Sequence, residues 1–182
     1  MQSGNTQEDF VVLVDDMDRE IGIREKLEAH KLGLLHRAFS IVYINSAGKM
    51  LLQKRHSGKY HSGGLWANSC CGHPRPGEKT EAAAKRRFRE ELGLDVTPEC
   101  IGKFIYCADL GGGMTENELD YVFLVTGDDA PMPHPLEIEE IKFVDPLWLA
   151  DSLQENPDIY SAWLPGVLSV YLESRKPFKS VF

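Results

Sequence analysis

Residues 72–94 read GHPRPGEKTEAAAKRRFREELGL and carry the strongest local pattern in the sequence. Within this stretch the apolar side chains of Ala84, Phe88 and Leu92 recur every four residues, with charged residues between them. This spacing predicts an amphipathic helix over 80–92, and the glycine that follows it is a typical helix terminator. The stretch is therefore predicted to be a loop that leads into a helix whose last turn presents carboxylates.

Strand-like apolar segments lie on both sides of this helix. They are expected at 10–14, 38–44, 50–54, 65–71, 101–108, 119–125 and 141–144. After residue 147, two helical patterns follow around Pro157 and Pro165. Because no repeat or linker divides the chain, residues 1–182 are predicted to form a single domain with a flexible N-terminus over 1–8. The expected fold is α/β or α+β, a mixed β-sheet sandwiched by helices.

The composition is that of an acidic globular domain. Of the 182 residues, 20 are basic and 28 are acidic, which gives a net charge of -8, and 42% are hydrophobic. These values exclude a disordered or fibrous chain and argue against a general nucleic-acid binder, which needs clustered positive charge. An anionic ligand would therefore have to be met by local cations or by a metal ion.

The sequence shows no signal for secretion or membrane insertion. The polar, acidic start lacks the features of a signal peptide, and the apolar run 10–14 is too short to span a bilayer. Two of the four cysteines, Cys70 and Cys71, are adjacent, which fits neither a disulfide framework nor a CxxC zinc motif. We therefore expect a cytoplasmic protein with no membrane partner and no nucleic-acid partner.

Two segments outside the helix place polar side chains on one face if their backbones are extended. Side chains alternate along a strand, so Cys71 and His73 would share a face while Cys70 points the other way. The same alternation puts Glu116 and Glu118 on one face. Each segment can therefore present two polar groups to the same site.

With His30 and His36 upstream, three histidines and two glutamates are available to converge on one ion. Such a mixed nitrogen and oxygen set fits an octahedral Mn²⁺ or Mg²⁺ ion, or an expanded Zn²⁺ or Fe²⁺ ion. The alternative for each residue is structural, since a lone histidine is more often a surface or core residue than a ligand. Under this structural alternative, Glu116 and Glu118 would be acidic loop residues and Cys71 would be a small buried apolar residue.

The stretch 72–94 resembles the Nudix box of diphosphate-processing enzymes, in which carboxylates late in the helix bind Mg²⁺ and, through it, phosphates. Glu90 and Glu91 occupy such positions, and because neighbours on a helix lie about 100° apart, at most one of them needs to face a metal. The alternative is a solvated helix face on which they pair with Arg86 and Arg87. The box usually has a glutamate where this chain has Arg87, which counts against pyrophosphohydrolysis and adds a cation beside a diphosphate.

Four segments make the resemblance more specific. The segments 34–40, 66–74, 116–118 and 160–163 read LLHRAFS, WANSCCGHP, ENE and YSAW, and in this order they resemble the type I isopentenyl diphosphate isomerases. The likeness runs over 10–170, nearly the whole chain. It implies a Nudix fold and the isomerisation of isopentenyl diphosphate to dimethylallyl diphosphate in isoprenoid biosynthesis, by protonation and deprotonation through a carbocation.

The resemblance also implies roles for individual residues. Cys71 and Glu118 would be the acid/base groups on opposite faces of the allyl unit. Tyr106 would assist Glu118, and Trp163 would face the reacting carbons. A thiolate at Cys71 suits proton removal, and we expect nearby cations to lower its pKa. The phosphates would pair with Lys26, Arg55, Lys59 and Arg87.

Two kinds of divalent ion are implied as well. One of them, Mg²⁺, would arrive with the diphosphate, and its protein contacts would be Glu91 and the main-chain oxygen of Cys71. The interval from His30 to His36 is one residue shorter than in some bacterial members, which leaves the role of His30 open. The protein's own ion, Mn²⁺, Mg²⁺ or Zn²⁺, would be held by His30, His36, His73, Glu116 and Glu118.

Two other functions stay open on the sequence alone. One is a Nudix pyrophosphohydrolase, which releases phosphate or a monophosphate, and the other is a non-catalytic module that binds metal and diphosphate. All three functions predict a small-molecule partner, which for the isomerase is a prenyl diphosphate. The expected oligomeric state is a monomer or a weak dimer.

Overall fold

The computed structural model describes residues 9–59 and 61–176. In this part of the chain the strands form one mixed sheet, which confirms the expected fold class. The strands are β1 (Phe10–Val14), β2 (Glu20–Glu25), β3 (His36–Ile44), β4 (Met50–Arg55), β5 (Trp66–Ala67), β6 (Cys70–Gly72), β7 (Glu99–Gly111), β8 (Met114–Thr126) and β9 (Ile138–Val144). The N-terminus expected over 1–8 lies outside the described residues, and the single domain over 1–182 stays a prediction.

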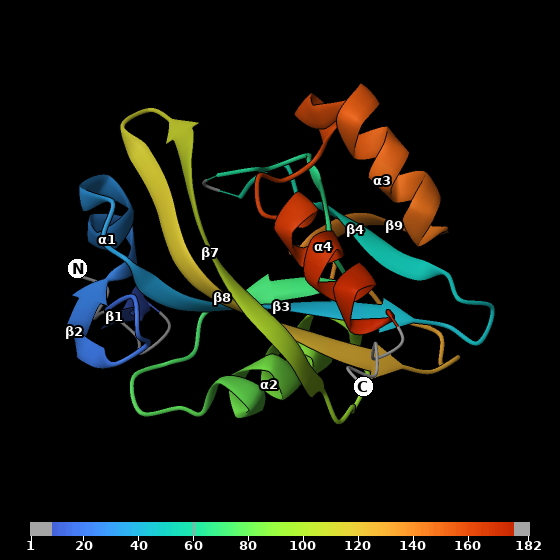
Figure 1. Cartoon of the computed structure of the whole chain (residues 1–182), viewed down its shortest axis with the longest axis horizontal. Helices are drawn as coiled ribbons and strands as arrows, with labels where there is room; N and C mark the ends of the chain where they lie inside the picture. Colours follow the sequence, from blue (N-terminus) through green and yellow to red (C-terminus); the bar gives the residue numbers. More distant parts are fainter. Residues whose placement is uncertain (1–8, 60, 177–182) are drawn as a thin grey trace, which may run out of the picture.

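Helices α2 and α4 cover opposite faces of this sheet (Figure 1). The helices are α1 (Lys26–Leu32), α2 (Thr80–Leu92), α3 (Pro146–Glu155) and α4 (Leu164–Ser174), with a 3₁₀ turn at Pro157–Ile159. A bilayer crossing requires more length and apolar character than any helix in the described part of the chain has.

Strand β3 is the centre of the sheet. It pairs in parallel with β8 over its whole length, from His36 opposite Glu118 to Ile44 opposite Thr126. On its other side it pairs antiparallel with β6. Strand β8 also pairs antiparallel with β7, and the two form a long curved ribbon (Figure 1). The parallel pairing brings His36 and Glu118 side by side although they are far apart in the sequence.

The core is divided between the two faces of β3. Ile41 and Tyr43 pack in the cluster that includes Phe88 of α2, whereas Val42 packs in the cluster that includes Leu164 of α4. Both faces of the strand are therefore buried. This explains why β3 reads as a continuous apolar run rather than as an alternating one.

The helix predicted over 80–92 is confirmed with the same ends. Phe88 is fully buried against the sheet. Gly93 adopts a left-handed conformation with φ +70°, which ends the helix as its position predicted. The loop before the helix is held by Glu78, which accepts two hydrogen bonds of 2.8 Å from the guanidinium of Arg86.

The sequence patterns did not indicate β2 or α1. Strand β2 exposes most of its side chains and so lacks the alternation of a half-buried strand. Helix α1 has seven residues, and its first turn is stabilised by the Glu25 carboxylate, which accepts two main-chain N–H bonds. The strand expected over 65–71 is two short strands instead, because Asn68 and Ser69 bond main-chain oxygens of β3 and β4 through their side chains.

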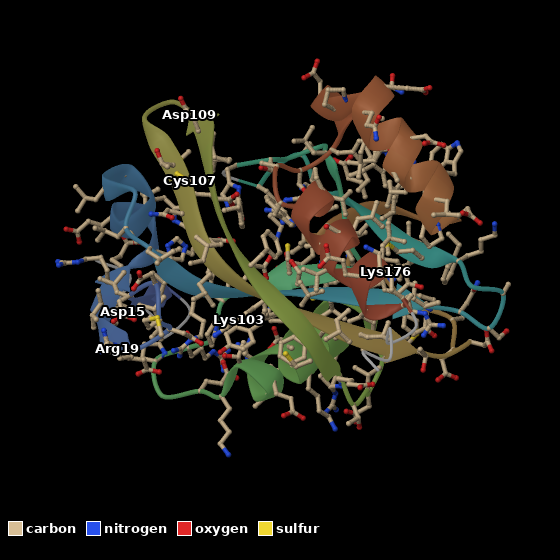
Figure 2. All side chains as sticks on the ribbon, viewed as in Figure 1. Asp15, Arg19, Lys103, Cys107, Asp109 and Lys176 are labelled. Atoms are coloured by element: carbon tan, nitrogen blue, oxygen red, sulfur yellow. The ribbon has the colours of Figure 1, made fainter. Side chains whose placement is uncertain are left out.

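Strand β7 turns alternate side chains outward and inward. Lys103, Cys107 and Asp109 are exposed on its outer side (Figure 2). Tyr106 points inward and lines a pocket. Because Tyr106 is the register partner of Glu118 on β8, these two side chains leave the ribbon on the same face.

Candidate active site

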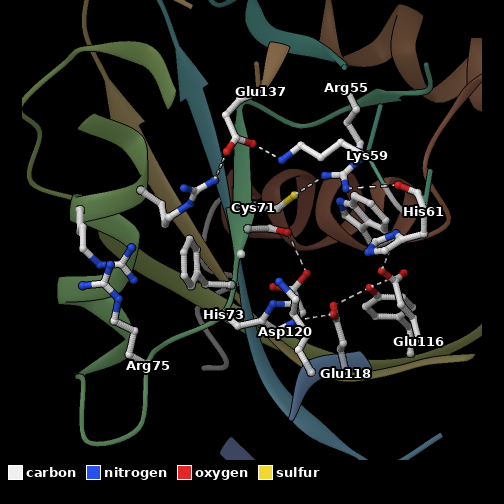
Figure 3. A pocket seen from close by; sticks show the side chains of 18 of the residues that line it. Arg55, Lys59, His61, Cys71, His73, Arg75, Glu116, Glu118, Asp120 and Glu137 are labelled. Carbon is white, nitrogen blue, oxygen red and sulfur yellow. Dashed lines mark hydrogen bonds and ion pairs between the residues drawn. The ribbon is translucent and has the colours of Figure 1, made fainter. Parts of the chain in front are cut away.

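One pocket collects most of the residues singled out in the sequence. Its volume is about 230 Å³, slightly below the usual range for ligand pockets, so it suits a small molecule. Figure 3 shows its side chains converging from the sheet and from α2. His30, His36 and Glu91 are buried outside this lining. The predicted residues that line the pocket are Lys26, Arg55, Lys59, Cys71, His73, Arg87, Tyr106, Glu116, Glu118 and Trp163.

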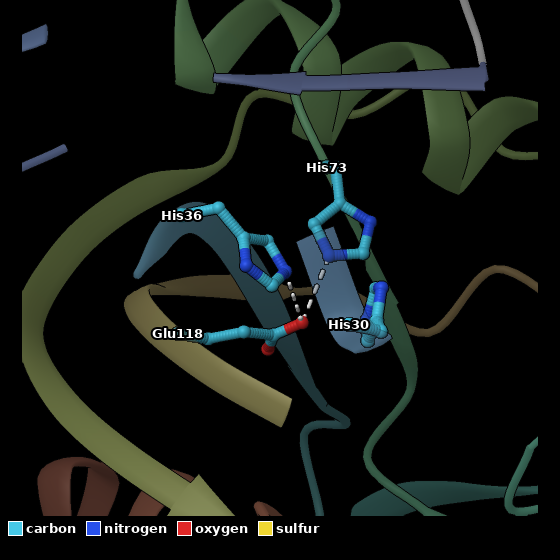
Figure 4. Close-up of side chains that lie close together, drawn as sticks. All are labelled: His30, His36, His73 and Glu118. Atoms are coloured by element: carbon cyan, nitrogen blue, oxygen red, sulfur yellow. Dashed lines mark hydrogen bonds and ion pairs between the residues drawn. The ribbon is translucent and has the colours of Figure 1, made fainter. Parts of the chain in front are cut away.

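Four of the predicted metal ligands form one cluster, His30, His36, His73 and Glu118, with donor atoms within 4.8 Å of one another (Figure 4). The Nε2 atom of His73 lies 2.8 Å from Glu118 Oε1, and the Nε2 atom of His36 lies 3.5 Å from the same oxygen. The ring of His30, from α1, lies 4.9 Å from that of His36 between centroids. The structure thus brings His30 to the same point as the other histidines.

Main-chain carbonyls orient two of these rings. His30 donates from Nδ1 to the Lys26 carbonyl at 2.6 Å, and His36 donates from Nδ1 to the Leu34 carbonyl at 2.7 Å. A carbonyl can only accept, so the neutral form of each ring has its proton on Nδ1 and its lone pair on Nε2. Nε2 of His36 is buried and has no hydrogen-bond partner among the described residues. An imidazole held in this way is typical of a metal ligand.

Glu116 lies beside the cluster and is 2% exposed. Its Oε2 accepts a hydrogen bond of 3.1 Å from the Tyr106 hydroxyl. Burial, followed by repulsion from the charge of Glu118, raises the pKa of Glu116 to about 9. Two buried carboxylates therefore cannot both be ionised without a nearby cation. This donor set of imidazoles and carboxylates fits a divalent metal ion.

His61 was not predicted as part of the site. It lies between β4 and β5, and its Nδ1 is 3.4 Å from Glu116 Oε1. Burial lowers the pKa of His61 to about 3 and that of His73 to about 4, so both rings are neutral at pH 7. Nothing in the local sequence distinguishes His61 from His56, a half-buried histidine on the same loop. Only the fold identifies it.

Cys71 and Trp163 lie around the side chain of Arg55. The guanidinium donates from Nη1 to Cys71 Sγ at 3.4 Å, and it stacks 5.2 Å from the centroid of the Trp163 ring. Trp163 is held in turn by a 2.9 Å hydrogen bond from its Nε1 to Asn68. Cys70 packs in the opposite core, so the expected separation of the two cysteines is confirmed.

The expected lowering of the Cys71 pKa is wrong. Burial raises the pKa of this thiol to about 12, although the positive charge of Arg55 opposes the shift. Nearby cations favour a thiolate, but desolvation, which the amino-acid sequence does not reveal, outweighs them. Cys71 is therefore a neutral thiol at pH 7 in this structure rather than a thiolate.

A group of basic side chains lies on the other side of the pocket. Lys59 and Arg87 both pair with Glu137, the latter at 3.4 Å (Figure 3). Lys26 lines the same pocket as these two cations, and its pKa is lowered by burial and by their repulsion, although Asp9 opposes the shift. Glu137 was not predicted, since a single acidic residue in a loop gives no pattern to recognise. The group is electropositive enough to receive a diphosphate.

The two adjacent glutamates of α2 differ in environment, as their helical spacing predicted. Glu90 is exposed and pairs with Arg86 and Arg87, which is the solvated alternative. Glu91 is 3% exposed, pairs with Arg87 and accepts a 3.2 Å hydrogen bond from Gln53. Only Glu91 therefore faces the interior.

Lys54 and Arg55, which are neighbours on β4, differ in environment. The side chain of Lys54 lies 3.9 Å from Glu139 and does not line the pocket, whereas that of Arg55 does. The alternation of side chains along β4 accounts for this difference.

Residues 34–164 match the family model of the NUDIX domain. The fold is shared with solved structures of low sequence similarity. The DR0079 protein of Deinococcus radiodurans has a TM-score of 0.72 over 88% of this chain and 97% of its own, at 18% identity. The MutT protein from Methanosarcina mazei has a TM-score of 0.64 over 78% of this chain and 96% of its own, also at 18% identity. These matches define the fold as that of a NUDIX domain protein.

Relatives with higher sequence identity define the family within this fold. The isopentenyl-diphosphate Delta-isomerase 1 of Aromatoleum aromaticum is 47% identical over 169 residues, which cover 93% of this chain and 96% of the relative. The isopentenyl-diphosphate Delta-isomerase 2 of Photorhabdus laumondii is 44% identical over 162 residues, covering 89% and 92%. The chain therefore belongs to the isopentenyl-diphosphate Delta-isomerase family of NUDIX domain proteins. The resemblance inferred from the motifs is confirmed.

Proposed function

We propose that this protein interconverts isopentenyl diphosphate and dimethylallyl diphosphate by adding a proton to one end of the allylic unit and removing one from the other. The observation that carries the proposal is the common pocket of Cys71, Glu118 and Trp163, with a cationic group at its other side. A proton donor, a proton acceptor, an aromatic wall and a diphosphate subsite are the parts that this reaction needs.

The diphosphate binds at the cationic side of the pocket. Its proposed partners are Lys26, Arg55, Lys59 and Arg87. In the structure Lys59 and Arg87 pair with Glu137, so diphosphate oxygens would replace this carboxylate. Mg²⁺ accompanies the diphosphate, and Glu91 together with the main-chain oxygen of Cys71 is the proposed contact to it. Glu91 already lies next to Arg87, which supports this assignment.

Glu118 and Tyr106 form one proton-transfer unit at the other end. The Tyr106 hydroxyl donates to Glu118 Oε2 at 2.5 Å, which allows a proton to pass between the two groups. The residues proposed to hold the resident ion are His30, His36, His73, Glu116 and Glu118. Bound there, a divalent ion, Mn²⁺, Mg²⁺ or Zn²⁺, would withdraw electron density from the Glu118 carboxylate and strengthen the acid with which it shares a proton.

Cys71 is the proposed proton-transfer group on the opposite face of the allyl unit. A turnover needs one of the two groups to be protonated and the other to be ionised at the start. The neutral thiol of Cys71 and an ionised Glu118, whose pKa is lowered despite burial by its hydrogen bonds to His36 and His73, satisfy this condition. Because the two groups exchange roles in the reverse direction, the same pair supports both directions of the isomerisation.

The tertiary carbocation formed between the two proton transfers has to be sheltered from water. Trp163 is 3% exposed and is one wall of the pocket. An indole face stabilises a nearby cation by ~2 kcal/mol when the site is dry. Exclusion of water also prevents hydration of the cation to an alcohol. The rigid hydrogen bond from Trp163 to Asn68 supports this role by fixing the ring.

The experiment that tests the function is incubation with isopentenyl diphosphate and Mg²⁺ in D₂O. We expect deuterium in the methyl group formed from the terminal methylene, with no phosphate released. Release of phosphate or a monophosphate would identify a pyrophosphohydrolase. Binding of the diphosphate without deuterium uptake would identify a non-catalytic module.

The proposal extends to the cellular location, the partner and the oligomeric state of the protein. All four cysteines are free thiols, which supports the proposed cytoplasmic location, because disulfides are rare in a reducing compartment. The proposed partner is a small prenyl diphosphate, and the proposed oligomeric state is a monomer or a weak dimer.

A further inference from the structure

His61 is a buried histidine that the proposed mechanism does not use. It lies on the loop between β4 and β5, and its side chain is 7% exposed. Its Nδ1 is 3.4 Å from Glu116 Oε1, and its ring centroid is 5.7 Å from that of His30. Arg55 contacts the loop through a 3.5 Å hydrogen bond to the carbonyl of His61. The side chain thus reaches the proposed metal centre from an element that supplies none of its other ligands.

Two groups of donor atoms meet at His30. One contains His30, His36, His73 and Glu118, and the other contains His30, His61 and Glu116. The Nδ1 atom of His30 donates a hydrogen bond to the Lys26 carbonyl, so only Nε2 has a lone pair that can bind a metal ion. One lone pair binds one ion. If His30 holds the ion, both groups therefore surround the same ion rather than two separate ones.

The spacing of the rings agrees with a single centre. In each group the donor atoms lie within 4.8 Å of one another. An octahedral ion with ligands at about 2.1 Å keeps its donors about 3.0 to 4.2 Å apart, so modest side-chain rotations suffice. The ring of His61 is 5.7 Å from that of His30, which is no farther than the 6.0 Å between His30 and His73. His61 is therefore placed like a member of the cluster.

We infer that His61 is a sixth protein donor to the resident metal ion, an inference that rests on the metal centre of the proposed function. Four imidazoles and two carboxylates then complete an octahedral set. A catalytic ion that activates water keeps an open coordination position. A complete set of protein ligands leaves none, which suits a reaction whose cationic intermediate water would destroy.

The test uses Mn²⁺ as the probe, in the absence of diphosphate and Mg²⁺. The full-length protein is stripped with a chelator, reloaded with one equivalent of Mn²⁺, and examined by water-proton relaxation and by electron paramagnetic resonance with ¹⁵N-labelled histidine. We expect four coordinated histidine nitrogens and no coordinated water in the unchanged protein. This measurement needs no variant, so it decides the inference even if a substitution impairs folding.

His61→Ala should then leave three coordinated nitrogens, admit a water molecule that increases proton relaxation, and weaken Mn²⁺ binding by about tenfold or more. His134→Ala is the matched control, because His134 is exposed and outside both donor groups. Three coordinated nitrogens with a bound water in the unchanged protein would overturn the inference and make His61 a hydrogen-bond partner of Glu116. Failure of the unchanged protein to bind Mn²⁺ would instead overturn the metal centre itself.

Discussion

The hydroxyl of Tyr106 donates a 2.5 Å hydrogen bond to Glu118 Oε2 and a 3.1 Å hydrogen bond to Glu116 Oε2. The antiparallel register of β7 and β8 sets this relationship, because Tyr106 and Glu118 are opposite each other in the ribbon. Burial raises the pKa of Tyr106 well above its usual value, so the hydroxyl remains a donor at neutral pH. A single phenol therefore connects the two carboxylates of the candidate site.

Tyr106→Phe is expected to lower kcat by about 100-fold and to leave KM for isopentenyl diphosphate nearly unchanged. The reason is that the role proposed for the hydroxyl is in proton transfer rather than in diphosphate binding, and positioned proton transfer contributes about 10² to 10⁴ in rate. Steady-state kinetics measure the effect. Tyr171→Phe, which alters a buried tyrosine of α4 away from the pocket, is the control. A large change in KM with normal kcat would contradict the assigned role.

Cys71→Ala is expected to reduce isomerisation by about 10³-fold, because one of the two proposed proton-transfer groups is lost. Metal content and thermal unfolding should change little, since the only hydrogen bond of the thiol within the described residues is the one that it accepts from Arg55 at 3.4 Å. Deuterium uptake from D₂O and metal analysis are the measurements. Cys107→Ala, at an exposed position of β7, should behave like the unchanged protein (Figure 2). Near-normal turnover by Cys71→Ala would remove the thiol from the mechanism.

Glu118→Gln is expected to lose activity and metal affinity together. One oxygen of this carboxylate lies 2.8 Å from His73 and 3.5 Å from His36, and the other accepts from Tyr106, so one residue serves both purposes. Metal content after dialysis and turnover are measured on the same preparation. Glu140→Gln changes an exposed glutamate of β9 and is the control. Unchanged metal content in an inactive Glu118→Gln protein would refute the dual role.

Arg87→Gln is expected to raise KM for the diphosphate substrate by about 10- to 100-fold. A hydrogen bond to a charged group contributes about 1.5 to 3 kcal/mol, and each 1.4 kcal/mol is a factor of ten. Arg89→Gln is the matched control, because it removes the same charge from an exposed position of the same helix. Equal effects of the two substitutions would mean that long-range charge, not a direct contact, determines binding.

Acid is expected to destabilise the metal-free protein through His73. Burial lowers the pKa of His73 from 6.5 to about 4. Between these two pH values His73 binds a proton in the unfolded chain but not in the folded chain. The contribution of the neutral His73 ring to the free energy of unfolding is therefore complete above pH 6.5 and is lost as the pH falls toward 4. A shift of one unit corresponds to about 1.4 kcal/mol, which predicts a loss of about 3 kcal/mol.

Chemical denaturation in the presence of a chelator at several pH values measures this loss. The comparison is with His73→Gln, because Glu116 has the opposite dependence: burial raises its pKa to about 9, which favours the folded state at lower pH. The unchanged protein should lose more stability than the variant between pH 6.5 and pH 4. Parallel curves for the two proteins would exclude the predicted contribution of His73.

The pattern of apolar residues in short stretches of sequence predicted the helices and strands that bury one or both faces. The period of Phe88 and Leu92 identified α2 with its correct ends, and the apolar run of 38–44 identified the central strand. The exposed β2 and the seven-residue α1 gave no such signal. They form because β2 pairs with β1 and Glu25 caps α1, and these interactions do not require a periodic apolar pattern.

The residues of the candidate site also form two groups, those that sequence motifs identified and those that only the fold identified. The quoted motifs of the family contained Cys71, His73 and Glu118, so these residues could be named before any coordinates were known. His61 and Glu137 could not, because each is a single polar residue in a loop and its contacts come from distant segments.

The amino-acid sequence alone determined the family, the helix over 80–92 and the chemical types available to the site. Tertiary structure decided which of those groups meet and in which protonation state. Parallel pairing of β3 with β8 sets His36 opposite Glu118, and burial keeps Cys71 a thiol where the sequence suggested a thiolate. The physical reason is that desolvation and convergence depend on every element packed around the pocket, whereas sequence pattern reports only on neighbours along the chain.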